Sequence, residues 1–211
     1  MIDASDPETL YSLCRLSDSA KAKSKPILYW IGAGASAWSG YALWSDLSDQ
    51  FHSTFLRSEP RYDRRAGIDL LKRRDYPGLF QLCKDTNQQL YYSQLARAFE
   101  PKQISPVYSR FIDIISNTQP LYAVTTNVDE CLEHNLVSVT TVQHSDLERC
   151  IELLQCRTSF VCKLHGTVSS VESGVFTTRD YELCVKDPRY LHLLQHLFAE
   201  CTPHFHFELH L

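Results

Sequence analysis

The sequence predicts an α/β fold of the Rossmann-like three-layer type, with a mostly parallel sheet between two layers of helices. Three short apolar runs, at residues 27–31, 121–125 and 159–164, indicate buried strands, and segments with helical periodicity separate them. Each run leads into small or polar residues, as at the ligand-binding edge of an open parallel sheet. A chain of 211 residues suffices for one globular domain of this kind.

The charge balance narrows the range of partners. The chain has 21 Lys and Arg against 25 Asp and Glu, a formal net charge of −4, so nucleic acid is expected as an indirect partner at most. No apolar run approaches the ~20 residues that cross a bilayer. The first ten residues lack the basic and apolar regions of a signal peptide. We therefore expect a cytoplasmic protein without a membrane partner.

The cysteines and one histidine pair do not indicate a metal site. The eight cysteines include no C-x-x-C pair, and they are too sparse for a disulfide framework, so reduced and mostly buried thiols are expected. His192 and His196 are one helical turn apart, but Leu193 follows the first where the zincin motif needs Glu. We expect this pair on a solvated or partner-facing helix.

The first part of the chain predicts a helix, a strand and a second helix. A capping-box pair ahead of leucines at three-residue steps predicts an amphipathic helix over residues 6–20, which with its linker fills residues 1–26. The strand at 27–31 follows. Apolar side chains then recur every four residues and predict a helix over 39–56. They are Leu43, Leu47, Phe51 and Phe55.

The middle of the chain predicts a helical insertion before the sheet resumes. Residues 57–118 contain several proline-punctuated helical stretches and no strand pattern. After the strand at 121–125, a short helix is expected to end near His134. The capping-box spacing of Ser145 and Glu148 predicts a further helix.

The last residues of the chain do not show the pattern of a central strand. A helix expected over 188–200 should lead into another strand, yet residues 201–211 contain Pro203 and three histidines. Such a segment suits one edge strand at most. We therefore expect a divergent tail and a sheet that is incomplete at this end.

A glycine-rich turn follows the first strand. Gly32-Ala-Gly-Ala-Ser-Ala37 fits G-x-G-x-x-(G/A) between a predicted strand and a predicted helix. Its glycines permit a tight turn and close approach to a pyrophosphate at a helix N-terminus. The spacing around Ser36 is not that of a hydrolase nucleophile elbow. A dehydrogenase is disfavoured because Asp46 and Asp49 fall on a helical pattern, not on a second strand.

Two more polar motifs end strands. Thr125-Thr-Asn-Val-Asp129 follows the second apolar run and Lys163-Leu-His-Gly166 ends the third. Because the carboxyl ends of parallel strands meet at one edge, Asn127 and His165 are expected to face the glycine turn. Taken singly, Asn127 or Thr126 would also suit a helix N-cap, and His165 a hydrogen-bonded structural residue.

The ordered set GAGAS, TTNVD and LHG resembles the sirtuin, or silent information regulator, superfamily. The segment 175–181 and Ser39-Gly-x-x-x-Trp44 are similar to the bacterial sirtuin-like branch associated with NAD depletion in antiphage defence. The resemblance implies a sirtuin-like NAD-binding domain over 27–200. It further implies an NAD+ hydrolase (NADase) that releases nicotinamide and ADP-ribose.

The same resemblance assigns roles to individual residues. Asn127 and His165 would be catalytic: Asn127 would position the nicotinamide ribose and the attacking water, and His165 would bind a ribose hydroxyl or act as base. Asp129 would hold the carboxamide. The other cofactor-binding candidates are Gly32, Ala33, Gly34, Ser36, Trp44 and Thr126. NAD would be the substrate, no metal is expected, and an oxocarbenium-like transition state needs orientation more than a strong acid.

The sequence also departs from the family pattern. Residues 167–178 contain no cysteine, where deacylating sirtuins carry a four-cysteine zinc module, so protein deacylation is disfavoured. Thr126 stands where deacylases place glutamine, and residues 202–211 lack the glycine and serine of the adenosine-binding loop. A non-catalytic NAD-binding module therefore stays open as the main alternative. A truncated sheet would expose apolar faces, so a homo-oligomer or a defence-system partner is expected to cover them.

Overall fold

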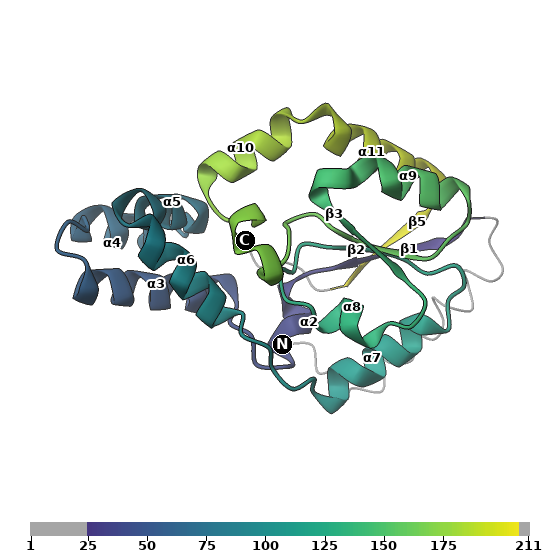
Figure 1. The fold of residues 1–211 in the computed structure, drawn as a ribbon, viewed down its shortest axis with the longest axis horizontal. Helices are drawn as coiled ribbons and strands as arrows, with labels where there is room; N and C mark the ends of the chain where they lie inside the picture. Colours follow the sequence, from purple (N-terminus) through teal and green to yellow (C-terminus); the bar gives the residue numbers. More distant parts are fainter. Residues whose placement is uncertain (1–24, 207–211) are drawn as a thin grey trace.

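The computed structural model describes residues 25–206 and shows an α/β domain with a helical lobe on one side (Figure 1). In chain order the elements are β1 (Ile27–Ile31), α2 (Ala33–Ala37), α3 (Trp44–Ser58), α4 (Arg64–Lys72), α5 (Tyr76–Thr86), α6 (Gln88–Ala98), α7 (Pro106–Ser116), β2 (Tyr122–Thr125), α8 (Cys131–Asn135), β3 (Thr140–Gln143), η1 (His144–Asp146), α9 (Leu147–Gln155), β4 (Phe160–Lys163), η2 (Val168–Ser173), α10 (Thr178–Lys186), α11 (Pro188–Glu200) and β5 (Thr202–His206). The helix predicted over 6–20 lies outside the described residues.

The sheet has five strands, all parallel, in the order β3-β4-β2-β1-β5. In register, Ile31 of β1 lies beside Thr125 of β2, which lies beside Lys163 of β4. The carboxyl ends of these three strands therefore reach the same edge. The predicted α/β fold with a parallel sheet is confirmed.

Helices cover both faces of the sheet. Successive side chains of β1 point to opposite faces, so every one of them packs against a layer of helices. Ile27, Tyr29 and Ile31 pack toward α7 and α8, whereas Leu28 and Trp30 face α9 and α11. Figure 1 shows α9 and α11 above the sheet and α2, α7 and α8 below it. A strand buried on both faces needs apolar side chains at every position.

Helices α3 to α6 form a lobe with a core of its own (Figure 1). The aromatic residues Phe51, Phe55, Phe80 and Tyr91 are almost fully buried there. The predicted stretch 57–118 is free of strands in the structure, and α7, its last helix, packs on the sheet through Phe111 and Ile115.

Two predicted helix starts were wrong in detail. Leu43 is the N-cap of α3 and is 43% exposed, because the chain from Ser39 to Leu43 turns before the helix begins at Trp44. The predicted capping box of Ser145 and Glu148 is absent from α9: its N-cap is Asp146, which makes no side-chain cap, and a short 3₁₀ turn precedes it. The helices themselves exist, because packing of an apolar face stabilises them more than any cap.

Of the two edge strands, β3 was missed, and β5 lies in the tail for which the sequence allowed one edge strand at most. β3 was not predicted, since its outer residues Thr140 and Thr141 are exposed and give no apolar run. In the predicted tail, residues Thr202–His206 form β5, which pairs with β1. Pro203 is tolerated because β5 is an edge strand and needs hydrogen bonds on one side only.

Within residues 25–206, no helix combines the length and apolar composition needed to span a membrane. The same residues contain no group of three or more His, Cys, Asp and Glu side chains that could hold a metal ion. His192 and His196 contact each other on the exposed side of α11, with 3.1 Å between their Nε2 atoms. All seven described cysteines are free, and five of them are buried.

Candidate functional site

A pocket lies where the carboxyl ends of β1, β2 and β4 meet the helical lobe. Its lining combines the three strand-end motifs with aromatic side chains from the lobe side. The lining residues are Ala33, Ser36, Tyr41, Ala42, Trp44, Leu47, Phe99, Thr126, Asn127, Val128, Asp129, His165 and Phe176. Segments about 130 residues apart in the chain thus share one cavity.

The Asn127 side chain is fixed by the glycine turn. Its Nδ2 donates to the carbonyl of Gly32 at 2.9 Å and to Oγ of Ser36 at 2.8 Å, and its backbone N–H donates to Oγ1 of Thr125. Both amide protons are therefore committed, which sets the orientation of the amide plane. The buried Oδ1 has no hydrogen-bond partner among the described residues. A buried acceptor without a partner is costly, so this atom is suited to receive a ligand donor.

Asp129 presents a buried carboxylate to the same pocket. The residue is 3% exposed, and its Oδ2 accepts from Oγ of Ser36 at 2.5 Å while Oδ1 accepts from the backbone N–H of Cys131. Ser36 accepts from Asn127 and donates to Asp129, so one hydroxyl links two motifs and fixes both. The side chain of Ser36 thus orders the pocket wall.

His165 follows β4 and faces the pocket from the opposite side to the glycine turn. Its ring makes an edge-to-face contact with Tyr181, with centroids 5.3 Å apart, and its Nδ1 has no partner among the described side chains and backbone groups. Burial, assisted by the nearby His144, lowers the pKa of His165 to about 4. The imidazole is therefore neutral at pH 7 and keeps one nitrogen able to accept a proton.

Aromatic rings close the pocket on the lobe side. Trp44 packs against Phe80 and Phe176, with centroids 5.5 and 5.9 Å apart, and Phe99 contacts both Tyr41 and Phe176. Such rings present mainly their π faces and edges, and the Tyr41 hydroxyl already accepts the backbone N–H of Lys102. Next to a carboxylate, they favour a flat ligand that carries positive charge.

The structure brings together most of the residues singled out from the sequence. Seven of them line the pocket, namely Ala33, Ser36, Trp44, Thr126, Asn127, Asp129 and His165. Gly32 contributes its carbonyl to Asn127, and Gly34 lies in α2 outside the lining. The lining residues that sequence reasoning missed are Tyr41, Ala42, Leu47, Phe99, Val128 and Phe176. Their only signal was apolar character, which core residues share.

Gly166 fixes the turn directly after His165, and its replacement gives a testable prediction. Gly166 has φ +79°, and an added Cβ would lie 2.8 Å from the carbonyl oxygen of Ser173. Gly40 has a similar φ of +82° with open space around it. We expect Gly166→Ala to lower the free energy of unfolding by about 2–3 kcal/mol and Gly40→Ala by about 1 kcal/mol. Urea denaturation measures both, and equal losses would show that backbone conformation alone matters at Gly166.

Comparison with known proteins adds a family match. Residues 122–206, which run from β2 to β5, match the family model described as a SIR2-like domain. No curated protein matches the chain. The matched region includes the Asn127 and His165 motifs, whereas the glycine turn and the helical lobe precede it.

Proposed function

Because the chain is a member of the sirtuin-like superfamily, whose SIR2-like domains bind NAD, we propose that it is an NAD+ hydrolase that cleaves the nicotinamide–ribosyl bond. The observation that carries the proposal is the pocket at three strand ends, in which Asn127 Oδ1 and His165 Nδ1 are both without partners. A buried amide oxygen and a buried ring nitrogen without partners in one pocket suit the hydroxyl groups of a ribose and an attacking water.

The electrostatics of the pocket support cleavage of a cationic substrate. The nicotinamide ring of NAD+ carries a positive charge, and the Asp129 carboxylate with the surrounding aromatic rings favours that charge. As the C–N bond breaks, its electron pair moves to the ring nitrogen and the positive charge passes to the ribose. The fixed carboxylate stabilises this charge without reorganisation.

Water then completes the reaction. Its oxygen attacks C1′ of the ribosyl cation, and its proton leaves to a base or to solvent, giving ADP-ribose. The neutral imidazole of His165 is suited to accept a proton or a ribose hydroxyl, and Asn127 Oδ1 is suited to orient the water. The glycine turn, through Ala33 and Gly34, would approach the pyrophosphate with its backbone.

NAD consumption by the purified chain at micromolar concentration tests the proposal. We expect stoichiometric release of nicotinamide and ADP-ribose, lost in Asn127→Ala and in His165→Ala. Binding of NAD without turnover, seen as a rise in Tm, would instead favour a non-catalytic NAD-binding module. Turnover that requires an acylated peptide would point to a deacylase.

We further propose a biological role and a mode of association for this hydrolase. A hydrolase that depletes NAD fits a cytoplasmic role in antiphage defence, acting as a homo-oligomer or with a defence-system partner. Large apolar side chains on the outer helices and β5 support an association surface, since Leu183, Val185, Leu191 and Phe205 are each more than 60% exposed.

A further inference from the structure

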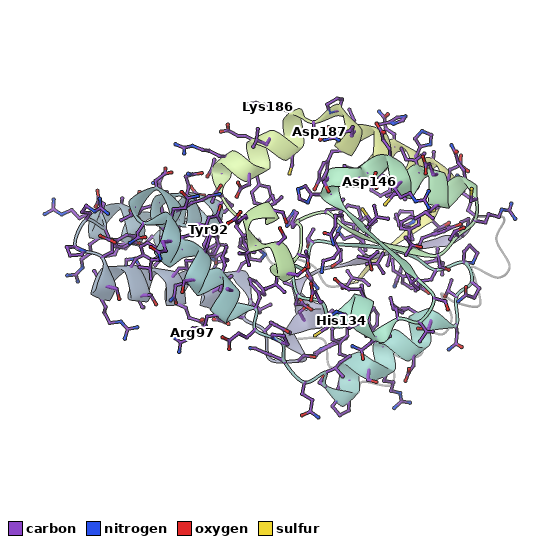
Figure 2. All side chains as sticks on the ribbon, in the orientation of Figure 1. Tyr92, Arg97, His134, Asp146, Lys186 and Asp187 are labelled. Atoms are coloured by element: carbon purple, nitrogen blue, oxygen red, sulfur yellow. The ribbon has the colours of Figure 1, made fainter. Side chains whose placement is uncertain are left out.

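The last residue of β4 is a lysine with no solvent exposure. Lys163 has a relative accessibility of 0%, and its ammonium donates to the backbone carbonyl of Asp129 and to Oε1 of Glu133 on α8. The side chain of Glu133 is 10% exposed. The next residue, His134, which is labelled in Figure 2, has a side chain that is 71% exposed. A fully buried lysine is rare in proteins and requires specific partners.

The Lys163 ammonium ties the end of β4 to the loop that follows β2. The main-chain ladder between β2 and β4 ends where the N–H of Leu164 donates to the carbonyl of Thr125 at 2.9 Å. The chain from Thr126 to Glu130 then leaves the sheet and carries Asn127 and Asp129 into the pocket. Beyond the ladder, Lys163 and the N–H of Val168, which donates to Val128 at 2.8 Å, tie this loop to the β4 segment.

Stability alone does not account for a buried ion pair at this place. Taking both charges out of water costs free energy, and an apolar pair of similar volume is often as stable or more stable. Burial also raises the pKa of Glu133, against the opposing effect of the Lys163 ammonium. What an apolar pair lacks is a donor to the carbonyl of Asp129.

We propose that Lys163 is a positioning residue for NAD cleavage, whose ammonium anchors the loop that carries Asn127 and Asp129. Glu133 neutralises that ammonium. The inference rests on the proposed function for its kinetic consequence, while the anchoring itself is independent of it. Lys163 lies two residues before His165, so the same strand end places the histidine and the opposing loop.

Three variants separate anchoring from stability. Lys163→Met alone leaves Glu133 buried without its partner, so Tm should fall by about 10 °C. The double variant Lys163→Met with Glu133→Leu removes both charges, and its Tm should return to within a few degrees of wild type. Glu133→Gln keeps an oxygen acceptor and leaves Lys163 in contact with Asp129, but it leaves the buried ammonium without its counter-charge. Its Tm should therefore also fall, whereas the kcat of the folded protein should fall less than that of the double variant.

The decisive measurement is the kinetics of the double variant Lys163→Met with Glu133→Leu, once its Tm is close to that of wild type. We expect its kcat for NAD to be about 10- to 100-fold below wild type with KM changed much less, because a loop displaced by a fraction of an ångström misplaces the reacting groups. Recovery of kcat together with Tm would overturn the proposal, since it would show that the pair only stabilises the fold. Lys163→Leu with Glu133→Met also removes the donor to Asp129 and makes the same comparison if the first pair does not fold.

Hydrogen exchange keeps the test independent of activity. In the double variant, amides of residues 127–131 should exchange at least about tenfold faster than in wild type, while those of β2 and β4 stay protected. Unchanged exchange would overturn the anchoring role. Absence of NAD cleavage in the wild type would refute the proposed function, and the exchange result would still decide whether Lys163 holds the loop.

Discussion

Replacing Asn127 by alanine is expected to lower kcat for NAD cleavage by about 10²–10³-fold, the largest effect that the pocket predicts for a single side chain. The side chain makes two donor contacts inside the protein and offers one acceptor to the ligand. Alanine removes the acceptor and also the donor to Oγ of Ser36, which keeps its own hydrogen bond to Asp129. Steady-state kinetics with a fluorescent NAD analogue or by nicotinamide release measures the loss.

A matched asparagine controls for nonspecific effects. Asn117 is the C-cap of α7, where its Nδ2 donates to the carbonyl of Asp113 in an exposed contact. Asn117→Ala should change kcat by less than about twofold, because it removes a similar hydrogen bond outside the pocket. Near-wild-type kcat in correctly folded Asn127→Ala would contradict the catalytic assignment of Asn127.

The second large expected effect is the dependence of activity on the neutral imidazole of His165. Because burial lowers the pKa of His165 to about 4, the free enzyme should hold a neutral imidazole throughout the range from pH 6 to 8. We expect kcat/KM to show no limb from this residue in that range and to fall as pH drops through about 4. His165→Ala should lower kcat by about 10²-fold or more if the imidazole takes a proton in the reaction.

The same shift makes stability depend on pH with a defined sign. An unfolded histidine titrates near ~6.5, so between about 6.5 and 4 the unfolded chain binds a proton that the folded chain excludes. His165 therefore reduces the free energy of unfolding as the pH falls through this window, with a slope of up to about 1.4 kcal/mol per pH unit. His165→Gln should remove this part of the acid destabilisation.

His134 supplies the control for both pH experiments. It lies on α8 with its side chain 71% exposed (Figure 2). His134→Gln should leave the pH profile of kcat/KM and the acid slope of stability nearly unchanged. An activity limb near pH 6.5 that disappears in His165→Ala would show instead that the imidazole titrates in the free enzyme near the ordinary histidine pKa.

The local sequence was sufficient to predict the central strands of the sheet and the order of the polar motifs that follow them. β1, β2 and β4 are buried on both faces, so their side chains are apolar except at the last residues of β2 and β4, Thr125 and Lys163, and they gave unmistakable runs. Because such strands are parallel, the residues that follow them had to reach one edge. The convergence of the glycine turn, Asn127 and His165 was therefore predictable from three separate segments.

The edge strands could not be predicted in the same way. β3 has exposed threonines at its start, and β5 contains Pro203 and histidines, so neither carries the pattern of a buried strand. Each exists because a neighbouring strand offers it a row of backbone hydrogen bonds. That contribution comes from the partner and leaves no mark in the strand's own sequence.

By itself, then, the sequence determined which segments form the three central strands of the sheet and which polar residues follow them. Only the tertiary structure decided that Tyr41, Phe99 and Phe176 wall the pocket, and that Lys163 is buried against the carbonyl of Asp129. The physical reason is that periodicity reports whether a side chain is buried and on which face. It does not report which distant side chain becomes its neighbour, and the chemistry of this site depends on those neighbours.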